Sequence, residues 1–145
     1  AQVHEGFYES PDMARLDLVR YARDLSAKLA ASHAVVPARV EGTEGCCLAD
    51  LERAVPFGLF LNEALSHCYR RGAGGDVTVT LDCIQGGVLS LRVAYECPEE
   101  RNDTDSGAAI GPGIVEALAA QLHGVLENSV RPDGRGGEIV LRCPR

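Results

Sequence analysis

The chain has 145 residues, which is enough for one domain with a single hydrophobic core. Its 14 basic and 21 acidic residues give a net charge of −7, and the basic residues are scattered, which argues against an extended nucleic-acid surface. No apolar run approaches the ~18 residues of a membrane span, so we expect a cytoplasmic domain without membrane contact.

The cysteines do not follow the pattern of a metal site. They show no Cys-x-x-Cys spacing and no paired histidine ligands, as a zinc site would require. Most of them lie in apolar runs, and we expect reduced thiols that act as small buried side chains. The six positions are Cys46, Cys47, Cys68, Cys83, Cys97 and Cys143.

The first predicted helix begins after Asp17, whose carboxylate can cap it, and ends near Ser32. Its apolar side chains recur at helical spacing, at Leu18, Tyr21, Ala22, Leu25 and Leu29. Two short β-prone runs follow at 35–40 and 46–48, and the glycine-containing sequence 41–45 between them predicts a turn.

A long central helix is predicted after Asp50, which can serve as its N-cap, with Pro56 in an early turn where a missing N–H costs least. Glu63 and His67 fall one turn apart, so a carboxylate and an imidazole share one face of this helix. An apolar stripe that includes Leu59 and Phe60 lies beside them. A glycine-rich loop around 72–75 closes the segment.

Beyond this loop the hydrophobic period changes to two. Apolar and polar residues alternate over 77–83 and again over 89–93, which predicts an antiparallel hairpin with one buried face. The following sequence, 96–113, is polar, acidic and without periodicity. Loops of that length in a compact domain are usually functional lids or disordered segments.

The last predicted elements are a helix over 114–122, with Gly124 as its C-terminal cap, and a second hairpin formed by 125–130 and 138–143. Helices and antiparallel hairpins in separate groups predict an α+β fold. We expect a two-layer sandwich in which three helices cover one face of a mixed sheet of about five strands.

The central helix resembles the N-box helix of the GHKL ATPases, and specifically that of bacterial sensor histidine kinases of the HWE type. In those kinases an Asn-Glu pair is followed four residues later by a second Asn. Asn62 and Glu63 match the pair, and His67 takes the place of the second Asn. Residues 114–127 resemble the helix that follows the glycine-rich lid of the family, and residues 136–144 resemble its closing strand.

The resemblance covers nearly the whole chain and implies one GHKL-type catalytic and ATP-binding-like domain over 1–145. Residues 1–16 would be the lead-in from a dimerisation helix region that is not part of the sequence. The family fold is the same two-layer sandwich, and its cofactors are ATP and Mg²⁺, held between the helix layer and the lid.

The resemblance also implies roles for individual residues. Glu63 occupies the position of the general base in ATP-hydrolysing members, and Glu63 and His67 occupy the positions near Mg²⁺. The cofactor-binding positions carried over from the family are Asn62, His67, Arg70, Arg71, Tyr95, Glu96, Ala109, Gly111 and Gly113. A role in the fold alone is the alternative for each of these side chains on the helix. Glu63 and His67 would then be hydrogen-bonded polar residues at the edge of the core, and the two arginines would be solvated side chains at the helix end.

The chain departs from the family in its adenine-binding box, an Asp-x-Gly-x-Gly sequence after the second hairpin strand. Tyr95 stands in place of the Asp, and Cys97 and Glu99 stand in place of the glycines. Glu96 is one position off, so it would point to the other side of an extended chain.

The chain also departs from the family in the lid and at the position near Mg²⁺. The Gly-Leu-Gly of the lid becomes Ala109-Ile110-Gly111, and the following Pro112 removes an amide donor next to Gly113. His67 is a poor partner for Mg²⁺, which prefers oxygen ligands.

The resemblance implies the ATP-binding catalytic domain of a two-component sensor histidine kinase. Such a domain phosphorylates a histidine on a preceding helical domain for transfer to a response regulator, and these two proteins or domains are the expected partners. His4, His33 and His123 lack the sequence context of an acceptor histidine. The altered boxes leave open an alternative, a pseudokinase that binds protein partners without ATP. An ATP-hydrolysing GHKL protein is a more distant alternative.

Overall fold

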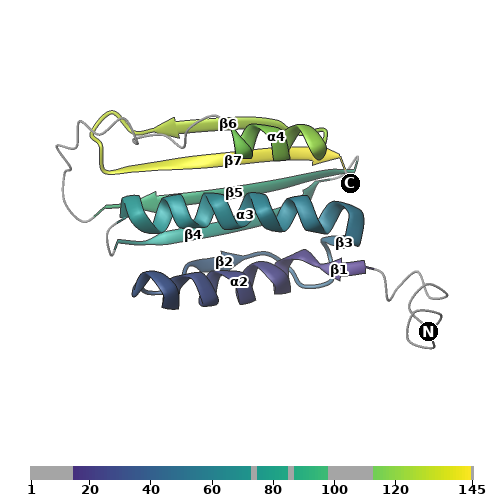
Figure 1. Cartoon of the computed structure of the whole chain (residues 1–145), viewed down its shortest axis with the longest axis horizontal. Coiled ribbons are helices and arrows are strands. Elements are labelled where there is room, and N and C mark those ends of the chain that lie inside the picture. The colour runs from purple at the N-terminus through teal and green to yellow at the C-terminus, as the bar shows by residue number, and fades with distance from the viewer. Residues whose placement is uncertain (1–14, 73–74, 85–86, 98–112, 145) are drawn as a thin grey trace.

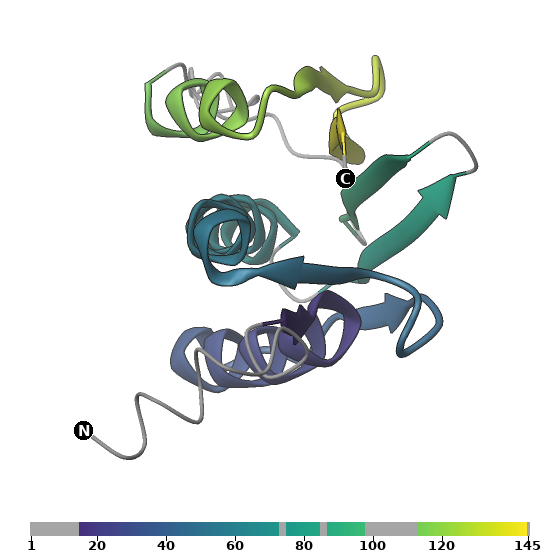
Figure 2. The ribbon, with the colours of Figure 1, turned by 90° about the vertical axis from the view of Figure 1, so that its right-hand side faces the viewer.

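The structure is a computed structural model that describes residues 15–72, 75–84, 87–97 and 113–144. Within these ranges, three helices form one layer and the strands of a five-stranded sheet form the other (Figures 1 and 2). The helices are α2 (Leu18–His33), α3 (Leu51–Gly72) and α4 (Ile114–Gln121). The strands are β1 (Arg15–Asp17), β2 (Arg39–Glu41), β3 (Leu48–Asp50), β4 (Val77–Ile84), β5 (Val88–Glu96), β6 (Val125–Val130) and β7 (Gly136–Pro144).

The large sheet has the strand order β2-β4-β5-β7-β6. β2 runs parallel to β4, and the other three pairings are antiparallel, so the sheet is mixed. The predicted fold class, an α+β two-layer sandwich with three helices on one face of a five-stranded mixed sheet, is confirmed. No helix within the described ranges has both the length and the hydrophobicity needed to cross a bilayer.

The register of the three central strands builds the core. Leu91 of β5 lies opposite Leu81 of β4 and Leu141 of β7, and Val93 lies opposite Val79 and Ile139 in the same way. All six side chains are buried. They form two rows on the face that α3 covers, as expected for strands with a side-chain period of two.

The two long helices begin at the predicted caps. Asp17 accepts hydrogen bonds from the backbone N–H groups of Val19 (3.1 Å) and Arg20 (3.4 Å) at the start of α2. Asp50 accepts one from the N–H of Arg53 (3.0 Å) in the first turn of α3. Both aspartates therefore satisfy N–H groups that a helix leaves without intrahelical partners.

Helices α2 and α3 pack closely at one point, where Tyr21 of α2 lies against Gly58 of α3. A Cβ atom built on Gly58 would lie 2.9 Å from Cε2 and 3.0 Å from Cζ of Tyr21. The hydroxyl group of Tyr69 in α3 connects the same two helices by a hydrogen bond, which it donates to the carbonyl oxygen of Ser26 in α2 (2.9 Å). The same hydroxyl group accepts a hydrogen bond from the N–H of Ala38 (2.9 Å).

The two short β-prone runs contribute to different sheets. Strand β3 pairs with β1 in a separate two-stranded sheet, and β2 pairs with β4 at the edge of the large sheet. The segment before β3 is held at this place because the N–H of Gly45 donates to Asp17 (2.9 Å) and the N–H of Leu18 donates to the carbonyl oxygen of Cys47 (2.8 Å).

Three smaller expectations were wrong in detail. Leu59 is 50% exposed, so the buried stripe of α3 runs through Phe57, Phe60 and other neighbours without it. Glu96 belongs to β5 rather than to the following loop, whose residues 98–112 lie outside the described ranges. The residue with left-handed backbone after α4 is His123 (φ 55°) rather than Gly124, and Ala34 (φ 56°) has this role after α2.

Candidate functional site

Asn62 and Glu63 lie side by side on α3, and both side chains are half-buried. Within the described part of the chain, neither has a hydrogen-bond or ion-pair partner. The helix position therefore leaves an amide and a carboxylate available to a ligand. Both groups carry oxygen atoms, which are the ligands that Mg²⁺ prefers.

His67 lies one turn further along α3 and is 8% exposed. Burial, and after it the positive charges of Arg70 and Arg71, lowers the pKa of His67 from 6.5 to about 4. The imidazole is therefore neutral at neutral pH. It is buried beside the exposed Arg70 and the half-buried Arg71, both in the last turn of α3, where positive charge interacts favourably with the helix dipole.

Tyr95 of β5 is 4% exposed and packs against His67. The two ring centroids lie 6.3 Å apart in an edge-to-face arrangement with an interplanar angle of 81°. Gly137 of β7 lies directly opposite Tyr95 in the sheet. A Cβ atom there would lie 3.0 Å from both Cε1 and the hydroxyl oxygen of Tyr95, so the phenol ring lies over this glycine.

Glu96 lies on the opposite face of the sheet from Tyr95, as the alternation of an extended strand predicts. Its carboxylate forms an exposed ion pair with Arg131 at 3.3 Å. The structure therefore does not bring Glu96 together with the predicted site residues of α3.

Cys97 fixes the end of β5 next to α3. It is 8% exposed, its Sγ atom donates to the carbonyl oxygen of Arg71 (2.9 Å), and its N–H donates to the carbonyl oxygen of Arg135 (2.7 Å). The side chain of Cys97 thus contacts the end of α3.

Of the three predicted lid residues, the structure describes Gly113, and Ala109 and Gly111 lie outside the described ranges. Gly113 is exposed, precedes α4 and has a φ of 116°, a conformation that favours glycine. Its carbonyl oxygen accepts the first helical hydrogen bond, from the N–H of Ala117 at 3.0 Å.

Glu63 and His67 were also predicted to lie near a metal ion. No group of three or more His, Cys, Asp or Glu side chains within the described ranges is placed to hold one. A metal at this position would therefore take most of its ligands from water or from a bound nucleotide.

Gly137 was missed by sequence reasoning, although it supports Tyr95. Its signal is present in the sequence as the second glycine of 136–137 at the start of a strand. Only the register of β5 against β7 shows that this glycine faces Tyr95.

No protein-family model and no curated protein matches the chain. Several solved structures match the chain. A mycobacterial sensor histidine kinase, MprB, matches with a TM-score of 0.67 at 19% identity, over 90% of this chain and 95% of that one. The ATP-binding domain of PrrB from Mycobacterium tuberculosis matches with a TM-score of 0.60 at 15% identity, over 90% and 96% of the two chains. The fold is that of histidine kinase ATP-binding domains.

The blue-light activated histidine kinase of Erythrobacter litoralis has the same fold, with a TM-score of 0.66 at 19% identity over 89% of this chain. The chain spans 45% of the length of that kinase and 61% of a separately solved histidine kinase domain from it. The fold expected from the sequence resemblance is therefore the fold observed.

Proposed function

We propose that the chain is the catalytic and ATP-binding domain of a two-component sensor histidine kinase of the HWE-related class. The observation that carries the proposal is the pair Asn62 and Glu63, half-buried and without partners in the described part of the chain, on the central helix of a histidine kinase fold. A half-exposed amide and carboxylate at this place are accessible to a ligand rather than enclosed in the core.

Asn62 and Glu63 would hold Mg²⁺, since both offer oxygen atoms. Arg70, exposed at the end of the same helix, would place positive charge near the phosphates of ATP. His67, neutral and buried against Tyr95, would form the wall behind them rather than act as a metal ligand. A bound nucleotide would supply the phosphoryl group, and the acceptor would be a histidine on a helical domain, from which the group would pass to a response regulator.

The first test is calorimetric titration of the chain with ADP and with a non-hydrolysable ATP analogue, each with and without Mg²⁺. We expect dissociation constants in the micromolar range or tighter, a binding free energy of roughly 8 kcal/mol. Glu63→Gln should weaken binding about tenfold or more when Mg²⁺ is present, because it removes a charged oxygen ligand.

Glu52→Gln is the matched control, because Glu52 is exposed in the first turn of the same helix. It should bind as the unchanged chain does. Circular dichroism and thermal unfolding show whether each variant is folded. A folded Glu63→Gln variant with unchanged affinity would remove Glu63 from the site.

The contact between Tyr95 and His67 favours a second candidate, a pseudokinase that binds protein partners. The buried phenol ring stands where the resemblance places the carboxylate that accepts from adenine. A chain of this kind would give no heat with nucleotide up to millimolar concentration. It would still bind the helical phospho-acceptor domain or the response regulator, and the same calorimeter can measure that binding.

A further inference from the structure

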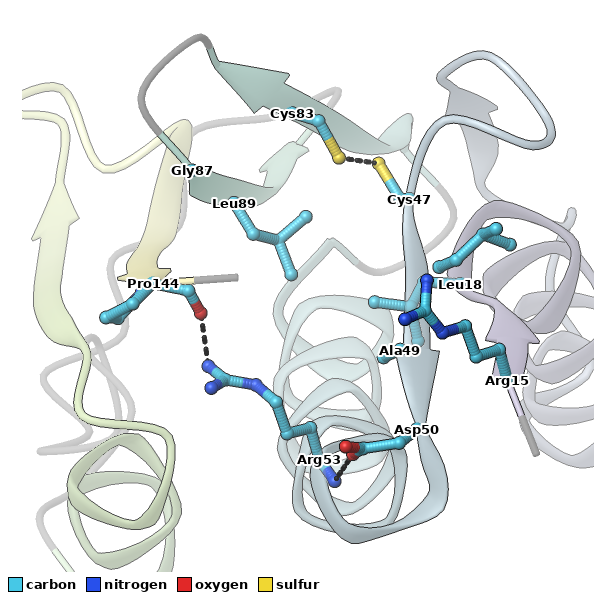
Figure 3. A pocket seen from close by; sticks show the side chains of 11 residues that line it. Arg15, Leu18, Cys47, Ala49, Asp50, Arg53, Cys83, Gly87, Leu89 and Pro144 are labelled. Atoms are coloured by element: carbon cyan, nitrogen blue, oxygen red, sulfur yellow. Dashed lines mark hydrogen bonds between the residues drawn. The ribbon is translucent and has the colours of Figure 1, made fainter. Parts of the chain in front are cut away.

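Cys47 and Cys83 bring their sulfur atoms to within 2.7 Å of each other. Cys83 lies on β4, and Cys47 directly precedes β3. Figure 3 shows the two sulfur atoms facing each other across the space between these segments. The sulfur atoms of a disulfide lie about 2.05 Å apart, so a displacement of well under an ångström brings this pair to bonding distance.

Both cysteines are held by ordered parts of the fold. The carbonyl oxygen of Cys47 accepts a hydrogen bond from the N–H of Leu18 (2.8 Å) at the start of α2. Cys83 lies opposite Leu89 in the antiparallel pairing of β4 with β5. The sulfur contact therefore joins the segment that leads into β3 to strand β4 of the large sheet.

The pair is accessible from one side. Cys47 and Cys83 line a pocket of about 560 Å³, and on its far side Arg53 donates a hydrogen bond to the carbonyl oxygen of Pro144 (Figure 3). Cys83 is partly exposed, whereas Cys47 is 2% exposed. A small oxidant can therefore reach Cys83 first and leaves Cys47 to act second.

We propose that Cys47 and Cys83 are an oxidation site at which peroxides produce an intramolecular disulfide. The Cys83 thiolate attacks one oxygen of hydrogen peroxide, the O–O bond breaks, and Cys83 becomes a sulfenic acid, while the hydroxide that leaves takes up the proton released by the thiol and becomes water. The Cys47 sulfur then attacks the sulfur of Cys83, the S–O bond breaks, and a second water leaves as the S–S bond forms. The two thiols together supply the two electrons that reduce the peroxide. This modification is independent of nucleotide binding.

The other cysteines are less suited to the reaction. Burial raises the pKa of the Cys68 thiol to about 12 and also raises the pKa of Cys143, which keeps both in the unreactive thiol form. Cys97 is buried, and its thiol donates to a backbone carbonyl group. Cys46 is exposed beside Cys47, so it is the competitor that an experiment must remove.

The test uses the reduced chain and its Cys46→Ser variant, treated with hydrogen peroxide, blocked with N-ethylmaleimide, digested with trypsin and analysed by mass spectrometry without reduction. We expect peptide 40–53 linked to peptide 72–92, in the Cys46→Ser variant at a mass two hydrogens below the sum of the two peptides, and in the unchanged chain with one maleimide adduct in addition on Cys46. The link should form in both proteins and vanish on treatment with a reducing agent.

Cys83→Ser is the second variant, because a partly exposed position tolerates the change better than the buried Cys47 does. It should fold, as judged by circular dichroism, and should lose the linked peptide entirely. Either of two results would overturn the proposal. One is a folded Cys46→Ser chain in which Cys83 is alkylated or oxidised to the sulfinic acid without the link. The other is a link that forms only between separate chains.

Discussion

The buried imidazole of His67 is the residue whose protonation should affect stability most clearly. Its pKa is lowered to about 4 in the folded chain, chiefly by burial and also by Arg70 and Arg71, whereas the unfolded chain has the ordinary value of 6.5. Between these two pKa values the unfolded state binds more protons than the folded state does. The contribution of His67 to the free energy of unfolding is therefore fully present above pH 6.5 and is lost as the pH falls toward 4. We expect the free energy of unfolding to be lower by about 2 kcal/mol at about pH 5 than at about pH 7.5.

Urea unfolding at the two pH values measures this difference. His67→Asn should lose that part of the pH dependence, whereas His123→Asn, at an exposed position, should keep it. Equal pH dependence in the His67→Asn variant and the unchanged chain would show that His67 is not the group responsible.

Single residues were predictable from sequence when neighbours along the chain determine their environment. The alternation of β5 predicted that Glu96 would face away from Tyr95, and the structure places it so. The packing of Tyr95 between His67 and Gly137 was not predictable, because it joins α3, β5 and β7. These elements meet only through the helix-to-sheet packing and the register of β5 against β7.

At the scale of elements, the contact between α2 and α3 depends on a glycine in the middle of a helix. Replacing Gly58 with Ala would ordinarily stabilise a helix by up to about 1 kcal/mol. Here the new Cβ would meet the ring of Tyr21, so we expect Gly58→Ala to reduce the free energy of unfolding by about 1 to 2 kcal/mol. Urea unfolding at neutral pH measures the change.

A double-mutant cycle shows whether the contact of the new Cβ with Tyr21 is what destabilises the Gly58→Ala chain. In a Tyr21→Ala background the obstruction is gone, and Gly58→Ala should then stabilise the chain. If Gly58→Ala reduced the free energy of unfolding equally in both backgrounds, a steric clash with Tyr21 would not be the reason.

Elements with a local signal were predicted well. Asp17 and Asp50 identified the starts of α2 and α3 because a capping carboxylate acts within three residues of itself. The pairing of β1 with β3 was not predicted, since three residues are too few to show a period and their position depends on hydrogen bonds from Gly45 and Leu18.

At the scale of the whole molecule, the proposed disulfide should stabilise the fold. It would link positions 36 residues apart and so reduce the conformational entropy of the unfolded chain. We expect the oxidised Cys46→Ser chain to have a free energy of unfolding greater than that of the reduced form by roughly 3 to 4 kcal/mol. Guanidinium unfolding of the two forms measures this, and Cys83→Ser should show no difference after the same treatment. A smaller stability in the oxidised chain would indicate that the bond strains the native state.

The strand order has a consequence for the sequence of events in folding. The antiparallel strands β4 and β5 are joined by a short turn, and so are β6 and β7, so each hairpin can form soon after the chain begins to collapse. The parallel pairing of β2 with β4 closes across the whole of α3 and joins residues 39 apart, Arg39 and Thr78. The pairing of β5 with β7 is also non-local, since Leu91 and Leu141 lie 50 residues apart. We therefore expect the two hairpins to form before either of these pairings joins them into one sheet.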